Sequence, residues 1–167
     1  MMKKTTLMIA LAAMTSLNLF AAEPQTILPC PENVPLKWRM EGAAKVLEDG
    51  SVELVSSGMA ERPGAIRWMP LRSGEKYVFT AEMKGENIGK KQHESHGVVL
   101  GVFIEVDGKW RQLGEKIELA GTFDWLPVTC NVAIPAEFKG TSGNLIIGLF
   151  NVAGKLNVRN VRMTKLD

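Results

Sequence analysis

The stretch from residue 76 to residue 84 alternates between apolar and polar side chains, and this period constrains the fold more than any other feature. Tyr77, Phe79, Ala81 and Met83 share one side, whereas the positions between and after them are mostly polar. A period of two predicts a β-strand in a sheet that has one buried face.

Further segments of this kind, separated by turn residues, run to the end of the chain. The predicted strands are 44–47, 52–55, 65–69, 76–84, 98–106, 116–119, 125–134, 145–150 and 156–163. Asp-Gly pairs at 49–50 and 107–108 predict hairpin turns, and we expect the last two strands to pair with each other. Beyond the first 22 residues, no stretch of a dozen residues has the apolar period of a helix. The sequence therefore predicts an all-β fold, an antiparallel two-sheet jelly-roll sandwich.

The first 22 residues have the layout of a secretory signal peptide. Lys3 and Lys4 precede an apolar run at 7–13, and Ala21 and Ala22 follow it. We expect cleavage after Ala22 and bacterial-type export to the periplasm or the exterior.

The remaining chain divides into two predicted parts. Residues 23–35 contain four prolines and should form an extended leader without regular pairing over most of its length. Residues 36–167 should form the sandwich.

Net charge and the length of the apolar run argue against two classes of partner. Removing the first 22 residues takes away two lysines and leaves 18 basic against 18 acidic side chains. Nucleic-acid binding needs clustered positive charge, so we do not expect it. The apolar run at 7–13 is shorter than the ~20 residues of a spanning helix, so we expect no membrane insertion after processing.

Two cysteines remain in the exported chain, Cys30 and Cys130. One interpretation is a disulfide, which would contribute about 4–5 kcal/mol by closing a loop of about 100 residues. The alternative is that Cys130 is a core residue, because it shares its parity with Val128 and Val132.

A pattern of apolar, Gly, apolar, Phe occurs at 100–103 and again at 147–150. If the first residue of each points into the sandwich, the outward set is Gly101, Phe103, Gly148 and Phe150. Glycine inside a strand often marks a close approach to the backbone. We expect either a shallow groove walled by the two phenylalanines, where sugar rings stack, or glycines that only ease the curvature of the sheet.

Five segments occur in a recognisable order: Tyr-Val-Phe-Thr-Ala-Glu-Met-Lys-Gly at 77–85, Val-Asp-Gly-Lys at 106–109, Gly-Thr-Phe-Asp-Trp at 121–125, Pro135, and Leu-Asn-Val-Arg-Asn-Val at 156–161. Together they resemble the CenC-type carbohydrate-binding modules, which are galactose-binding-domain-like β-sandwiches. The likeness covers about residues 34–166. It implies a non-catalytic jelly roll that binds poly- or oligosaccharide on a concave sheet or at the sandwich edge.

The tryptophans are the candidate sugar platforms. Trp68 stands beside Arg67, which pairs a stacking face with a hydrogen-bond donor, and Trp110 follows the turn at 107–108. We expect polar help from Glu82, Lys84 and Glu105. Trp38 should hold the leader against the sandwich, and the resemblance implies that Trp125 is a structural plug at the start of its strand.

The sequence argues against an enzyme. Glycoside hydrolysis needs paired carboxylates, and the nearest candidate, Glu105 to Trp110, has tryptophan in place of the last carboxylate of the jelly-roll glucanase pattern. His93 and His96 lack the spacing and the further ligands of a zinc site. We predict a secreted carbohydrate-binding module, with a structural or adhesive envelope protein that binds protein rather than sugar as the alternative.

The resemblance also bears on calcium. In that family the last strand usually ends in an acidic pair near a structural calcium, and the matching positions here are Arg159 and Asn160. Because Ca²⁺ favours several oxygen ligands that include carboxylates, we predict no firmly bound metal. Calorimetry should give the same melting temperature in excess calcium and in excess chelator, and a clear upward shift with calcium alone would contradict this.

Overall fold

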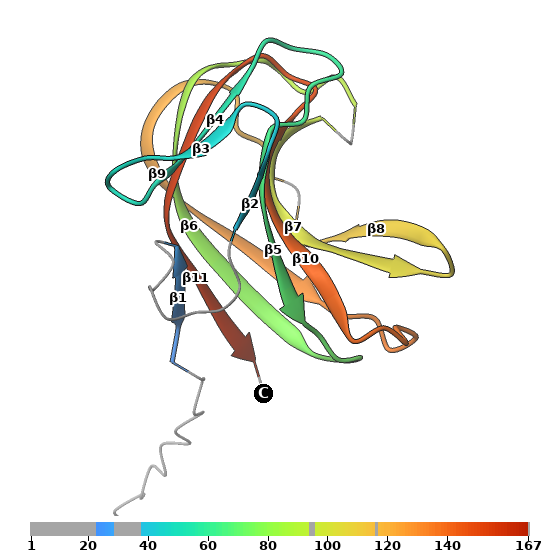
Figure 1. The fold of residues 1–167 in the computed structure, drawn as a ribbon. Helices are drawn as coiled ribbons and strands as arrows, with labels where there is room; N and C mark the ends of the chain where they lie inside the picture. The colour runs from blue at the N-terminus through green and yellow to red at the C-terminus, as the bar shows by residue number, and fades with distance from the viewer. Residues whose placement is uncertain (1–22, 29–37, 94–95, 116, 167) are drawn as a thin grey trace, which may run out of the picture.

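Two antiparallel sheets face each other in the computed structural model, which describes residues 23–28, 38–93, 96–115 and 117–166 (Figure 1). This confirms the predicted all-β sandwich. The six-stranded sheet has the order β3-β4-β11-β6-β9, with β1 also paired to β11. Its strands are β1 (Gln25–Leu28), β3 (Ala44–Val46), β4 (Val52–Ser56), β6 (Lys76–Ile88), β9 (Gly121–Ala133) and β11 (Gly154–Leu166).

The five-stranded sheet has the order β2-β5-β10-β7-β8. Its strands are β2 (Arg39–Glu41), β5 (Gly64–Pro70), β7 (Gly97–Val106), β8 (Lys109–Leu113) and β10 (Ser142–Phe150). The β7–β8 hairpin stands out from the sandwich in Figure 1. Its turn places Asp107 at φ 52° and Gly108 at φ 72°, which is the left-handed geometry that Asp-Gly hairpin turns favour.

The core forms where inward side chains of the two sheets meet. The alternation of β6 is confirmed, since Tyr77, Phe79, Ala81 and Met83 are all buried. The inward positions of β7 and β10 are apolar and buried in the same way; they include Leu100, Val102, Ile104, Leu145, Ile147 and Leu149. Each sheet therefore has one buried face and one outer face, and a ligand can reach the outer faces.

β11 connects most of the six-stranded sheet. One edge pairs with β6 from Lys155 to Leu166, and the other pairs first with β4 and then with β1. A bulge between Arg159 and Arg162 separates the two halves. Because the bulge adds a residue, Val158 and Val161 both point inward and are fully buried.

Three sequence predictions need correction or extension. The strand expected at 116–119 is wrong: residues 117–120 are not in a strand, and Lys109–Leu113 forms β8 instead. The expected pairing of the last two strands is also wrong, because β10 and β11 lie in different sheets. The leader pairs more than expected, since Gln25–Leu28 forms β1 against β11. The proposed signal peptide and residues 29–35 lie outside the described residues.

The glycines of the repeated pattern make room for the chain itself. A Cβ on Gly101 would stand 2.6 Å from the backbone oxygen of Leu113, and a Cβ on Gly148 would meet the ring of Phe150. Backbone cannot move aside as readily as a side chain, so Gly101 is the stricter requirement. The close approach that glycine in a strand suggests comes here from within the protein.

We expect Gly101→Ala to lower the free energy of unfolding by about 1–3 kcal/mol, as overpacking does. The control is Gly89→Ala, whose new Cβ would find its nearest atom at 3.5 Å, an ordinary contact. Urea unfolding of both variants measures the difference. Equal stabilities for the two variants would contradict the argument.

Candidate functional site

Exposed aromatic side chains gather on the outer face of the five-stranded sheet. Trp68 of β5 is 47% exposed and Trp110 of β8 is 62% exposed, the latter an unusually large value for tryptophan in a folded domain. Phe103 of β7 is half-buried on the same face. The face thus offers flat apolar surfaces that the fold itself leaves uncovered.

The strand register places polar side chains between these aromatics. Asn144 of β10 lies opposite Trp68 on one side and opposite Phe103 on the other, and Gln112 of β8 lies opposite Phe103. We call Trp68, Asn144, Phe103 and Gln112 the outer row. Sequence reasoning missed Asn144 and Gln112, because neither strand carries a signal of its register.

Trp110 and Glu105 form the next pair on this face, since they lie opposite each other on β8 and β7. Both side chains are exposed. From β5 to β8 there are three strand spacings of about 4.8 Å, so Trp68 and Trp110 lie about 14 Å apart across the strands. A single ligand that touches both must be longer than one sugar ring.

Phe150 lies on the same face but away from the outer row, opposite Gly97 of β7. Its ring covers Gly148 and the Arg62 guanidinium carbon lies 5.8 Å from its centre. Both phenylalanines of the repeated pattern are half-buried rather than fully covered. The groove between them stays a prediction, although the room beside each glycine is taken by the chain itself.

The outer face of the six-stranded sheet has a different character, because it is crossed by ion pairs. They are Lys45–Glu53 at 2.9 Å, Lys84–Asp124 at 3.2 Å, Lys155–Glu86 at 2.8 Å and Arg159–Glu82 at 2.6 Å. Two of the candidate polar residues, Glu82 and Lys84, are thus on this face. The fold does not bring them together with Trp68 and Trp110.

Trp125 is held under one of these pairs. The Arg159 guanidinium carbon lies 4.0 Å from the centre of the Trp125 ring, a cation–π contact, while its Nε donates to Glu82. The hydrogen bond from Arg159, and then one from Asn160, hold the pKa of Glu82 below its ordinary value. These contacts agree with a structural role for Trp125.

Arg67 points the other way from its neighbour Trp68. Alternation along β5 turns Arg67 into the sandwich, where it is 7% exposed, while Trp68 stays on the outer face. The two side chains therefore do not present one stacking face with one donor on the same surface. The sequence carried a signal for this placement, because Arg67 shares its side of the strand with the apolar Ala65 and Met69.

The remaining candidates are placed as follows. Cys130 is fully buried and forms no disulfide among the described residues, and burial raises the pKa of its thiol. Its proposed partner, Cys30, lies outside the described residues. The rings of His93 and His96 meet edge to face at 4.9 Å. Within the described ranges no group of three or more metal-ligating side chains comes together, and no helix there is long and apolar enough to cross a membrane.

Known proteins match this chain in structure and not in sequence. No family model matches it, and no curated protein does. A family 4 carbohydrate-binding module ("CBM4 structure and function") matches with a TM-score of 0.59 at 15% identity, over 80% of this chain and 90% of that chain. The chain therefore shares the β-sandwich fold of this module.

Two ligand complexes are also similar. A mutant of the family 29 module CBM29-2, complexed with cellulohexaose, matches with a TM-score of 0.54 at 9% identity, over 87% of this chain and 92% of that chain. The CBM22-1–GH10 modules of Clostridium thermocellum endo-1,4-β-D-xylanase 10B, complexed with xylohexaose, match with a TM-score of 0.52 at 12% identity, over 78% of this chain and 26% of that chain. At these identities the likeness concerns the fold.

The Glu82 carboxylate makes stability depend on pH. Its folded pKa is lower than its ordinary value of 4.5, so the folded state binds fewer protons than the unfolded state in this range. The contribution is present above pH 4.5 and is lost as the pH falls through the folded pKa. The free energy of unfolding, measured from pH 7 to pH 3, should decline less steeply in Glu82→Gln than in the wild type. Identical slopes for the two proteins would contradict this.

Proposed function

We propose that this chain is a secreted, non-catalytic carbohydrate-binding module that holds a poly- or oligosaccharide on the outer face of the five-stranded sheet. The observation that carries the proposal is the pair of exposed tryptophans, Trp68 and Trp110, on one face. Sugar rings offer apolar C–H faces that stack on such aromatics, and their hydroxyl groups need polar partners nearby.

The polar partners are available beside each platform. Asn144 and Gln112 supply amide donors and acceptors in the outer row, and the exposed carboxylate of Glu105 lies beside Trp110. On the opposite sheet, Lys45, Lys84 and Arg159 are each already paired with a carboxylate, and Trp125 lies under Arg159. This contrast favours the five-stranded sheet as the binding face.

The length of the platform supports an extended ligand. A sugar chain lying across the strands can reach both tryptophans, which are about 14 Å apart in the direction across the strands, whereas a monosaccharide contacts only one. The fold shared with carbohydrate-binding modules and the resemblance to the CenC type agree with this ligand class. The signal-like first 22 residues support action outside the cytoplasm.

Binding to glycans tests the proposal. Wild-type protein should be retained on insoluble polysaccharides such as cellulose or xylan, and calorimetry with a hexasaccharide should give a measurable affinity. Trp68→Ala and Trp110→Ala should each weaken binding about tenfold, because truncating an aromatic contact at a binding face costs about 1.4 kcal/mol or more.

The matched control is Trp125→Ala, which removes a tryptophan from the opposite sheet. Its sugar affinity should equal that of the wild type, once thermal unfolding shows that each variant is folded. Loss of binding in Trp125→Ala alone would move the site to the other face. Absence of retention on every glycan of a broad array would contradict the proposal and favour a protein partner.

A further inference from the structure

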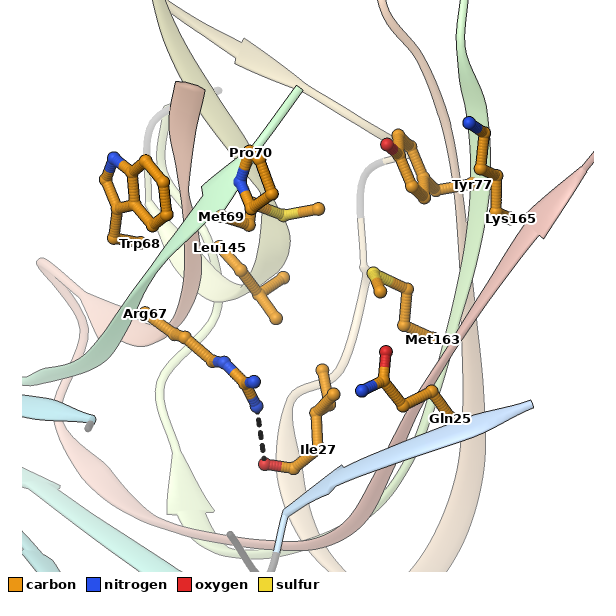
Figure 2. A pocket seen from close by; sticks show the side chains of 10 residues that line it. All are labelled: Gln25, Ile27, Arg67, Trp68, Met69, Pro70, Tyr77, Leu145, Met163 and Lys165. Atoms are coloured by element: carbon orange, nitrogen blue, oxygen red, sulfur yellow. Dashed lines mark hydrogen bonds between the residues drawn. The ribbon is translucent and has the colours of Figure 1, made fainter. Parts of the chain in front are cut away.

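A hollow lies between the two sheets, at the edge where β5 of one sheet faces β1 and β11 of the other. Its volume is about 430 Å³, within the range of small-molecule sites. It is lined by Gln25, Ile27, Arg67, Trp68, Met69, Pro70, Tyr77, Leu145, Met163 and Lys165. Figure 2 shows side chains of β5 and β10 on one side of this space and Ile27, Met163 and Tyr77 on the other.

The cavity contains a buried positive charge. Arg67 is 7% exposed, and within the described part of the chain its guanidinium makes one hydrogen bond, from Nη1 to the backbone oxygen of Ile27 at 3.2 Å. That oxygen also accepts from Trp38 Nε1 at 3.1 Å. A guanidinium has five N–H donors, and among the described residues no carboxylate pairs with it. Buried charges are normally paired, because leaving them alone is costly.

The other charged groups at this edge neutralise each other. Lys165 Nζ lies 2.7 Å from Glu75 Oε1, and the Tyr77 hydroxyl donates to Glu75 Oε2 at 2.6 Å. Burial acts to raise the pKa of Glu75, but the hydrogen bonds from Lys165, Tyr77 and the Arg72 backbone hold it below its ordinary value. Glu75 is therefore committed to these partners, and within the ranges that the structure describes no other carboxylate offsets the charge of Arg67.

Most of the rest of the wall is apolar, with Gln25 as a further polar side chain. Met69, Leu145 and Ile27 are buried inward side chains, and Met163 is half-buried opposite them. Such a wall favours the burial of a hydrocarbon chain, and it offers few hydrogen-bond partners to the many hydroxyl groups of a sugar. The charge and the wall together select a ligand with one anionic end and one hydrocarbon end.

We propose that this inter-sheet cavity is a binding site for a small amphiphilic carboxylate, such as a medium-chain fatty acid. The carboxylate accepts from the free N–H groups of Arg67, and the acyl chain lies against Met69, Leu145 and Met163. Arg67 is then a ligand-binding residue in a site separate from the outer row. Trp68 is the single residue near both, and in Figure 2 its ring is directed away from Ile27 and Met163.

Calorimetry with decanoate tests the site, and decanol is the matched probe that has the chain without the charge. Decanoate should bind saturably, one per chain, and at least tenfold more tightly than decanol. Arg67→Met keeps the apolar stem and removes the charge, so it should lose that tenfold preference while binding decanol as before. The control is Lys45→Met, which removes an exposed charge on the other sheet's outer face and should bind decanoate normally.

A second variant keeps the proposal falsifiable if Arg67→Met does not fold. Met163→Trp fills the cavity from a half-exposed position and leaves the charge in place, so it should abolish decanoate binding while hexasaccharide binding on the outer face persists. Equal affinity for decanoate and decanol would overturn the role of Arg67. No saturable decanoate binding to the folded wild type, or unchanged binding in Met163→Trp, would overturn the site itself.

Discussion

The closure of two sheets over one shared apolar layer is the constraint on which the rest of this molecule depends. A strand that contributes to such a layer must turn every second side chain inward, as β6 does with Tyr77 and Phe79. Position within a strand then decides whether a residue belongs to the core or to one of two outer faces. Arg67 and Trp68, adjacent in sequence, are separated in this way.

The outer faces of the two sheets carry different kinds of side chain. On the six-stranded sheet ion pairs cross the outer face, and the Trp125 ring is covered by Arg159. On the five-stranded sheet Trp68 and Trp110 have no such cover. Surface ion pairs contribute little stability, but each pair leaves two fewer charged groups free to contact a ligand. The protein thus presents one face crossed by ion pairs and one face with exposed tryptophans.

Alternation could be predicted from the sequence because it is local, and the inward and outward faces of β6, β7 and β10 followed from it. Register and sheet membership could not, because they depend on contacts between distant segments. Glu82 therefore fell on a different sheet from Trp68, and β10 and β11 do not pair although they adjoin in sequence. Asn144 could be assigned to the outer row only from the strand register, which places it opposite Trp68 and Phe103. Gly101 carried the right signal of a close approach, but the group that approaches is Leu113 of the same chain.

β11 has a consequence for how the protein assembles. This most C-terminal strand is central in its sheet and contacts β4, β6 and β1. Until it is in place, β6 lacks a neighbour on one edge and β1 has none to pair with. Pairing such distant segments costs a large loop-closure entropy before the stabilising contacts form. We therefore expect folding to be slow and concerted, because the sheet cannot be completed before its last strand is available.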